Sequence, residues 1–310
     1  MRNSKIVGTV VSLLLVMLLI VGCERFKLAE VKKEKVGDSE IAYYVRGQGE
    51  PLVMVMGFRG TMAIWDPALL EQLEKRFTLI LFDNRGVGLS TDGGKEPLTI
   101  EAMAEDTVGL IKQLGYEKVH LLGWSMGSEI AMEVAFKHPE VLNTLILCSP
   151  NPGGPHQAKR TSDAIRKLTA AKLSREEALS LLFPDTERGN RAANAYVSRL
   201  TSAVVIKSVP DDFKISPEVV ERQVQALKLW SEKSTAFEQL PSIKVPTLVA
   251  GGSSDVLDES ENVHIVASQI PFAWTAYFAG AGHNFLSQDH HYLSQLVTLF
   301  IESNKTAEKK

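Results

Sequence analysis

The chain has 310 residues, 45% of them hydrophobic and 23% charged, with a formal net charge of −3. This composition is typical of an ordinary globular protein, and the length suits one large α/β domain with an insertion. Lysines and arginines are scattered along the sequence instead of forming the basic surface that nucleic-acid-binding proteins need, so we expect no nucleic-acid partner.

The first 22 residues have the pattern of an export signal. Arg2 and Lys5 precede an uncharged apolar run from Ile6 to Gly22, as in a signal-peptide core. Cys23 follows the run in the sequence Ile-Val-Gly-Cys, which resembles the bacterial lipobox, whose cysteine is lipidated and begins the mature chain. We therefore expect residues 1–22 to be removed, and the exported protein to be anchored to a bacterial cell membrane or outer membrane through Cys23. An uncleaved anchor is the alternative, because the 17 residues of the run are at the short limit for spanning ~30 Å of hydrocarbon.

Residues 23–38 are polar and rich in lysine, which predicts a tether between membrane and domain. Ile41–Arg46 then alternates in hydrophobicity like an antiparallel edge strand, and six later segments are continuous apolar runs, as in parallel strands buried on both faces. These runs are Leu52–Met56, Thr78–Phe82, Lys118–Leu122, Thr144–Cys148, Thr247–Ala250 and Trp274–Phe278. Helical spacing recurs between them, over Trp65–Lys75, Thr99–Leu114, Ser125–Lys137, Ser260–Gln269 and Asp289–Glu302.

This alternation of strand and helix predicts an α/β fold with a doubly wound, mostly parallel sheet. The alternation stops over residues 151–240, which open with a turn-rich Asn-Pro-Gly-Gly-Pro segment and continue in helical, charge-mixed stretches. We expect a helical lid there, above the carboxyl edge of the sheet, where such folds bind ligands. The core then comprises residues 39–150 and 241–304, with a polar tail over 305–310.

The sequence Gly123-Trp-Ser125-Met-Gly127 follows a predicted strand and opens a predicted helix. This order is that of a nucleophile elbow, in which a serine occupies a strained turn and nearby glycines let strand and helix pass closely. Ser125 is therefore the candidate nucleophile. A serine hydroxyl needs a base within hydrogen-bond reach and a third group that orients the base.

His283 is the candidate base, because it lies in a glycine-rich loop directly after the last predicted strand. Asp255 is the candidate acid, since it follows the preceding strand. Asp258 is its rival, although we interpret it as the cap of the next helix, whose N-terminus favours an acidic residue. His156, at the start of the insertion, is another histidine that could touch substrate.

Two backbone amides must face the oxyanion of a tetrahedral intermediate. Met126, immediately after the serine, supplies the first candidate. Phe58 supplies the second, from the Gly57-Phe58-Arg59-Gly60 loop after the Leu52–Met56 strand. Phe58 and Trp124 are also expected to form an apolar substrate pocket.

These motifs resemble those of the α/β-hydrolase fold family, from about Ile41 to the C-terminal helix. The segment from Asp83 to Ser90 matches the family's Asp-x-Arg-Gly-x-Gly-x-Ser pattern. The resemblance implies that Asp83 and Arg85 are structural and not catalytic. The chain departs from the family at Met56-Gly57, where members often have His-Gly.

The leading hypothesis is hydrolysis of a small, apolar carboxylic ester through an acyl-enzyme, with no cofactor. Amide, lactone and carbon–carbon substrates remain open, as does cofactor-free perhydrolase or haloperoxidase-like activity. A ligand-binding or sensory protein with a retained triad is the alternative from another class. No metal is expected, because no histidine or cysteine pair has ligand spacing. Cys148, in a predicted strand, is interpreted as a core residue.

Overall fold

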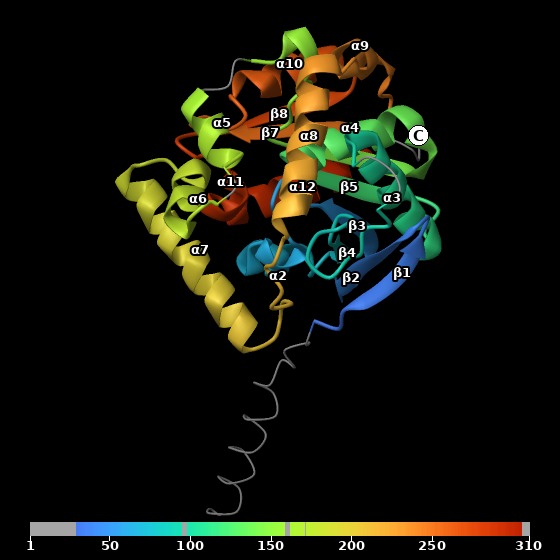
Figure 1. Ribbon diagram of the computed structural model, residues 1–310. Helices are drawn as coiled ribbons and strands as arrows, with labels where there is room; N and C mark the ends of the chain where they lie inside the picture. Colours follow the sequence, from blue (N-terminus) through green and yellow to red (C-terminus); the bar gives the residue numbers. More distant parts are fainter. Residues whose placement is uncertain (1–28, 95–97, 159–161, 171, 306–310) are drawn as a thin grey trace, which may run out of the picture.

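The computed structural model describes residues 29–94, 98–158, 162–170 and 172–305. Its centre is an eight-stranded sheet with the order β1-β2-β4-β3-β5-β6-β7-β8 (Figure 1). The expected signal sequence and Cys23 lie outside the described residues. Within the part of the chain that is described, no helix is both long enough and apolar enough to cross a membrane.

The expected α/β fold with a mostly parallel sheet is confirmed. Only β1 and β2, and β2 and β4, pair antiparallel, and every other neighbouring pair is parallel. The strands are β1 Lys32–Val36, β2 Ser39–Gly47, β3 Glu50–Val55, β4 Phe77–Phe82, β5 Val119–Trp124, β6 Leu142–Cys148, β7 Thr247–Gly252 and β8 Ala273–Phe278.

The two edges of the sheet differ from the sequence-based expectation. Residues 32–36, predicted as part of a tether, form the edge strand β1, which makes β2 an inner strand. The lysines of β1 are exposed, and charged side chains are a common way to protect an edge strand from further pairing. At the other edge, Trp274 and Tyr277 of β8 are exposed, so this strand is not buried on both faces.

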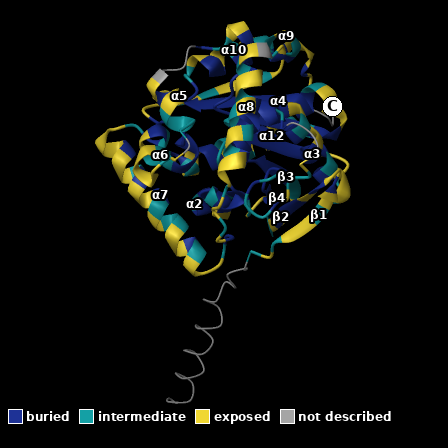
Figure 2. Ribbon diagram, viewed as in Figure 1, coloured by how far each residue is buried: buried dark blue, intermediate teal, exposed yellow. Residues whose placement is uncertain are grey.

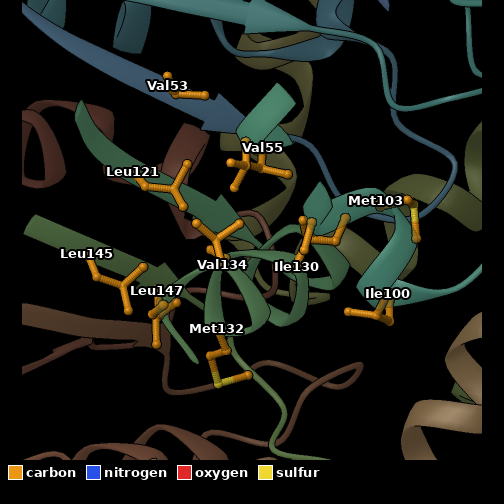
Figure 3. Close-up of a cluster of buried hydrophobic side chains, with 14 of the residues drawn as sticks. Val53, Val55, Ile100, Met103, Leu121, Ile130, Met132, Val134, Leu145 and Leu147 are labelled. Carbon is orange, nitrogen blue, oxygen red and sulfur yellow. The ribbon is translucent and has the colours of Figure 1, made fainter. Parts of the chain in front are cut away.

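Helices cover both faces of the sheet, and neighbouring strand residues point to opposite faces. Val53 and Val55 pack in the same cluster as Ile130, on the face covered by α3 Ile100–Gln113, α4 Met126–Lys137 and α10 Glu261–Gln269 (Figure 3). Leu52 and Met54 pack on the other face, against α2 Pro67–Leu73, α11 Phe285–Gln288 and α12 His290–Lys305. The inner strands are accordingly buried, whereas the edge strand β1 and the outer helix surfaces are exposed (Figure 2).

A helical insertion leaves the sheet after β6 and returns to it at β7. It contains α5 Ser162–Leu168, α6 Arg175–Leu182, α7 Glu187–Val205, α8 Pro217–Lys233 and α9 Ala236–Gln239. Side chains of Ser174, Thr186 and Ser216 accept hydrogen bonds from backbone amides at the starts of α6, α7 and α8, which fixes where these helices begin.

Short 3-10 turns occupy Met62–Ile64, Pro139–Val141, Gly154–His156 and Leu240–Ser242.

The insertion has two parts that pack differently. Trp230 on α8 and Ala236 on α9 belong to the large core cluster on the α4 face of the sheet. Helices α5 to α7 instead belong to two small clusters, one of which includes Leu257 from the loop after β7. Tyr196 on α7 also contacts the core, because its hydroxyl donates to Ile64 O at 2.8 Å. The helices from α5 to α7 are therefore the less deeply embedded part.

Candidate active site

Ser125 lies in a sharp turn between β5 and α4. Its backbone has φ 56° and ψ −125°, a conformation that side-chain-bearing residues rarely adopt. A side chain at Gly123 would collide with the backbone of Gly127, and one at Gly127 would collide with the backbone of Val55. Ser125 N donates to Cys148 O at 2.8 Å, so the strained turn is held by β6 as well as by its own glycines.

Asp255 and His283 are in direct contact although 28 residues separate them in the sequence. His283 Nδ1 lies 2.8 Å from Asp255 Oδ2, and both side chains are buried. Because an ionised carboxylate only accepts hydrogen bonds, this contact places a proton on Nδ1 and makes Nε2 the basic nitrogen. Ser149 Oγ also donates to Asp255 Oδ2, at 2.8 Å.

The loop from Gly57 to Gly60 packs on the serine turn. A Cβ atom at Gly57 would lie 2.8 Å from Trp124 O and 3.1 Å from Ser125 Cβ. Arg59 has φ 57°, and its backbone amide donates to Gln223 Oε1 on α8 at 3.1 Å. The loop therefore places Gly57, the residue before Phe58, beside Ser125.

The amide of Met126, the first residue of α4, is also at this turn. The first amides of a helix have no partner within the helix and are suited to bind negative charge.

Met56 is the residue at which the sequence departs from the family pattern. Its side chain is buried against Gly60, and its carbonyl accepts a hydrogen bond from Asn84 Nδ2 at 3.0 Å. Asn84 thus connects this loop to the loop after β4.

The neighbours of Asn84 hold other parts of the structure. Asp83 Oδ1 accepts from Met62 N at 2.6 Å, and Arg85 makes two hydrogen bonds to Asp106 on α3, at 2.5 and 2.7 Å. Burial raises the pKa of Asp83 to about 6. Neither Asp83 nor Arg85 lines the cavity described next.

A cavity of about 660 Å³ adjoins Ser125 and His283. Phe58 and Trp124 line it, as expected from the sequence. About half of the wall comes from the insertion, and most of that half is aliphatic or aromatic: Leu168, Leu173, Ala178, Leu181, Leu182, Phe213, Ile215, Pro217, Val220 and Leu227. The cavity therefore presents a mainly apolar surface to whatever reaches Ser125.

The wall also holds four charged residues: Arg59, Glu129, Lys172 and Asp258. The first three were not predicted as site residues, and Asp258 was considered only as the rival of Asp255. Arg59 donates through its guanidinium to Ala170 O, and burial lowers the pKa of this side chain. Glu129 is one helical turn after Ser125, a spacing that places the two residues on the same side of α4. That spacing is the signal from which Glu129 could have been found.

The interpretation of Asp258 as a helix cap is wrong. Helix α10 begins at Glu261, and its N-cap is Ser260, which makes no capping hydrogen bond through its side chain. Asp258 instead lies with Oδ2 at 3.5 Å from Ser125 Oγ. Partial burial raises the pKa of the neighbouring Glu259, and the negative charges of Asp255 and Asp258 raise it further.

His156, which was expected to be able to touch substrate, lies away from the cavity. Its ring stacks on that of Phe237, with ring centroids 3.9 Å apart. Among the described residues, no three histidine, cysteine, aspartate or glutamate side chains are grouped so that they could hold a metal ion.

Comparisons with known proteins agree on one family. The model of the alpha/beta hydrolase fold matches residues 50–289. A putative carbamate hydrolase RutD from Caulobacter sp. (strain K31) is 27% identical over 242 residues, which are 76% of this chain and 84% of that protein. Pyrrolizixenacetamide deacetylase from Xenorhabdus hominickii is 27% identical over 84% of this chain and 91% of its own length. A thermophilic esterase structure from Thermogutta terrifontis has a TM-score of 0.70 and 26% identity, over 89% of this chain and 99% of that one.

Proposed function

Since the chain belongs to the α/β-hydrolase fold family and is a hydrolase, we propose that it cleaves a small, apolar carboxylic ester through an acyl-enzyme. In this proposal Ser125 is the nucleophile, His283 the general base and Asp255 the acid that orients the histidine. The observation that carries the proposal is the 2.8 Å contact between Asp255 and His283, on a cavity whose wall also holds the strained Ser125.

The chemistry divides into two similar steps. His283 Nε2 takes the proton of Ser125 as Oγ bonds to the ester carbonyl carbon, and the same proton then passes to the departing alcohol as the C–O bond breaks. Water repeats the sequence on the acyl-enzyme, which releases the acid and restores Ser125. Asp255 stabilises the imidazolium that forms in each step, and Ser149 helps to hold its carboxylate in place.

The negative oxygen of each tetrahedral intermediate requires donors that are already in position. We assign this role to the amides of Met126 and Phe58. The first belongs to the N-terminus of α4, and the second to the loop whose Gly57 packs against Ser125. The apolar wall contributed by the insertion supports a substrate with an aliphatic or aromatic group, and we therefore assign the insertion, residues 151–240, the role of a lid.

A fluorophosphonate probe tests the assignment, because it reacts with an activated serine and scarcely with an ordinary one. We expect stoichiometric labelling at Ser125, no labelling of Ser125→Ala and almost none of His283→Ala. His156→Ala, which removes a histidine outside the cavity, is the matched control and should be labelled normally.

Two further outcomes distinguish the alternatives. A wild-type protein that is folded by circular dichroism, but unlabelled and inert towards short p-nitrophenyl esters, would be a binding protein. Peracid formation from an ester and hydrogen peroxide, faster than hydrolysis of the same ester, would identify a perhydrolase.

A further inference from the structure

The described chain begins beside the C-terminal end of helix α7. Ala29 N donates to Lys207 O at 3.0 Å, and Figure 1 shows both segments at the same end of the molecule. Cys23, the expected site of lipidation, is six positions before Ala29. A chain of six or seven residues spans at most about 25 Å. A lipidated Cys23, or an uncleaved apolar run that ends at Gly22, would therefore hold the end of α7 close to a bilayer.

The end of α7 presents apolar side chains to solvent. Val205 is 76% exposed, and Ile206, the C-cap of the helix, is 40% exposed. Single exposed apolar residues are common on protein surfaces and need no explanation. Two adjacent ones, at the point where the expected anchor joins the domain, are suited to contact with lipid.

Lys207 follows these two residues in a conformation that favours glycine. Its φ is 55°, and its side chain is exposed. The amide of Lys207 donates to Val204 O at 3.0 Å, and the next amide in the chain donates to Ala203 O at 2.9 Å. Helices that end with this pair of hydrogen bonds usually have glycine at the position of Lys207. A lysine there has a backbone cost, but it places a cation that can reach lipid phosphates beside two aliphatic side chains.

The other charges around the end of α7 are of both signs. Lys32 and Lys33 on β1 are exposed, and so are the carboxylates of Glu30 and Asp211. This mixture gives no strong attraction to anionic lipids. We therefore expect apolar contact to decide whether this surface binds a bilayer.

The loop after α7 connects this surface to the cavity. Arg46 on β2 donates through Nη1 to Ser208 O at 3.3 Å. Gly88 N donates to Lys214 O at 3.2 Å, so the core holds the loop at both of its ends. Between these two points lies Phe213, which is 45% exposed and also lines the cavity. The cavity therefore reaches the surface on the loop that follows the end of α7.

The wall of the cavity suits a chain that is soluble in a bilayer. Most of the part contributed by the insertion is aliphatic or aromatic. The wall also holds the cations Arg59 and Lys172 and the carboxylates Glu129 and Asp258, whose formal charges cancel. Recognition through the apolar groups favours an acyl chain, which a lipid bilayer also accommodates.

We propose that Val205, Ile206 and Lys207, together called the α7 tip, rest on the membrane to which the protein is anchored, and that the cavity takes its ester from this bilayer. This inference rests on the proposed esterase function and on the expected anchor. It names the substrate class as long-chain acyl esters dissolved in a phospholipid bilayer.

Two esters of 4-methylumbelliferone test the proposal, because both release the same fluorescent product. The butyrate is presented in water, and the oleate is dissolved in phosphatidylcholine vesicles. The enzyme is the full-length protein, made in a bacterial host that processes lipoproteins and reconstituted in the same vesicles. We expect the wild type to float with the vesicles and to hydrolyse both esters.

The double variant Val205→Ser and Ile206→Ser removes the apolar part of the α7 tip. We expect its rate on the oleate to fall about tenfold, because each aliphatic side chain contributes to lipid contact. Its rate on the butyrate should be unchanged, which also verifies that the variant is folded. Phe272→Ser with Tyr277→Ser is the matched control. These side chains are 61% and 48% exposed near β8, at the opposite edge of the sheet from β1, and their loss should preserve both rates.

A fluorophore reports directly on contact with lipid. Ile206→Cys that carries the environment-sensitive dye NBD should shift its emission to the blue when the protein is in vesicles. Tyr277→Cys that carries the same dye should not. The native Cys148 is fully buried, and we expect it not to take up the dye.

The results separate this inference from the function on which it rests. No hydrolysis of either ester would overturn the esterase proposal, and the NBD emission would still decide whether the α7 tip touches lipid. Four results would overturn the membrane role of the tip: a wild type that does not float, the absence of the blue shift, equal rates of the double variant and the wild type on the oleate, or an equal loss on both esters. A blue shift that needs no vesicles and grows with protein concentration would also overturn it, by identifying a second copy as the occupant.

Discussion

The indole Nε1 of Trp124 donates a hydrogen bond to the backbone carbonyl of His283 at 3.1 Å. The two rings also lie close together, with centroids 5.6 Å apart. The residue before the proposed nucleophile therefore holds the residue proposed as its base, and the β5 turn and the loop after β8 are fixed relative to each other. Trp124 was expected only to line the pocket, which it also does.

Replacing Trp124 by Phe keeps an aromatic ring and removes this hydrogen bond. The net value of such a bond is about 1 kcal/mol, which corresponds to a decrease in kcat of about fivefold if His283 loses its alignment. Steady-state kinetics with p-nitrophenyl butyrate would measure the effect.

Trp65→Phe is the matched control for that substitution. Trp65 is equally buried, but its indole N–H has no hydrogen-bond partner in the described part of the chain. The same chemical change there should leave kcat nearly unaltered. Equal effects of the two substitutions would show that the Trp124 bond has no special role.

Asp255→Asn should leave the fold intact and reduce turnover by about 10⁴, because the histidine loses control of its tautomer. Ser149→Ala removes only a hydrogen bond to the same carboxylate, so its decrease should be about tenfold or less. Single-turnover kinetics with a chromogenic ester would compare the two. If Asp255→Asn turned over at the wild-type rate, another carboxylate would have to orient His283.

The fold and the proposed triad could be read from the sequence because they depend on local patterns. Strand-length apolar runs, the Gly-x-Ser-x-Gly motif and the positions of Asp255 and His283 after two strands all follow from short segments. Asp258 could not be placed in this way. Its neighbours Asn151 and Ser125 are 107 and 133 residues away in the sequence, and only the folded sheet brings them together.

The edge strand β1 was missed for a related reason. The sequence of β1, Lys-Lys-Glu-Lys-Val, is mostly charged and resembles a linker. Its strand conformation depends mainly on pairing with β2, because Val36 is its one buried side chain. A sequence pattern records hydrophobic burial well and backbone pairing poorly.

Asp83 should make the stability of the protein depend on pH. Its pKa is raised from 3.8 to about 6 by burial, so between these values folded Asp83 retains a proton that the unfolded chain releases. The retained proton stabilises the folded state by about 3 kcal/mol below about pH 4, and this stabilisation is lost as the pH rises towards about 6.

Asp83→Asn cannot titrate and should lack this dependence. Urea unfolding of both proteins at about pH 4 and about pH 7 would show the wild type losing stability relative to the variant as the pH rises. A constant difference between the two proteins would mean that Asp83 does not titrate in this range.

Cys148 should be inert in the folded protein. It is fully buried at the end of β6, and burial raises the pKa of its thiol far above neutral pH. In a domain that begins after Cys23, a disulfide reagent such as Ellman's reagent should react with one thiol in denaturant and with none under native conditions. Fast reaction of the native domain would indicate local opening of β6.

The lipid anchor remains a proposal, since Cys23 lies outside the described residues. In a bacterial host that processes lipoproteins, Cys23→Ser should prevent incorporation of labelled palmitate and leave an unprocessed precursor. The wild-type protein should partition with membranes through the buried methylenes of its lipid chains. Palmitate that still labels the Cys23→Ser protein would exclude this cysteine as the lipidated residue.

The place of the helical insertion affects the order in which a newly synthesised chain can complete its sheet. A chain made only as far as β6 contains Ser125 in its turn, but Asp255, Asp258 and His283 all follow the insertion. Until β7 pairs with it, β6 offers an unpaired apolar side to other chains, which is a risk for aggregation. The arrival of β7 covers β6, and the loops after β7 and β8 supply the proposed partners of Ser125, so a chain truncated within the insertion would lack the proposed base.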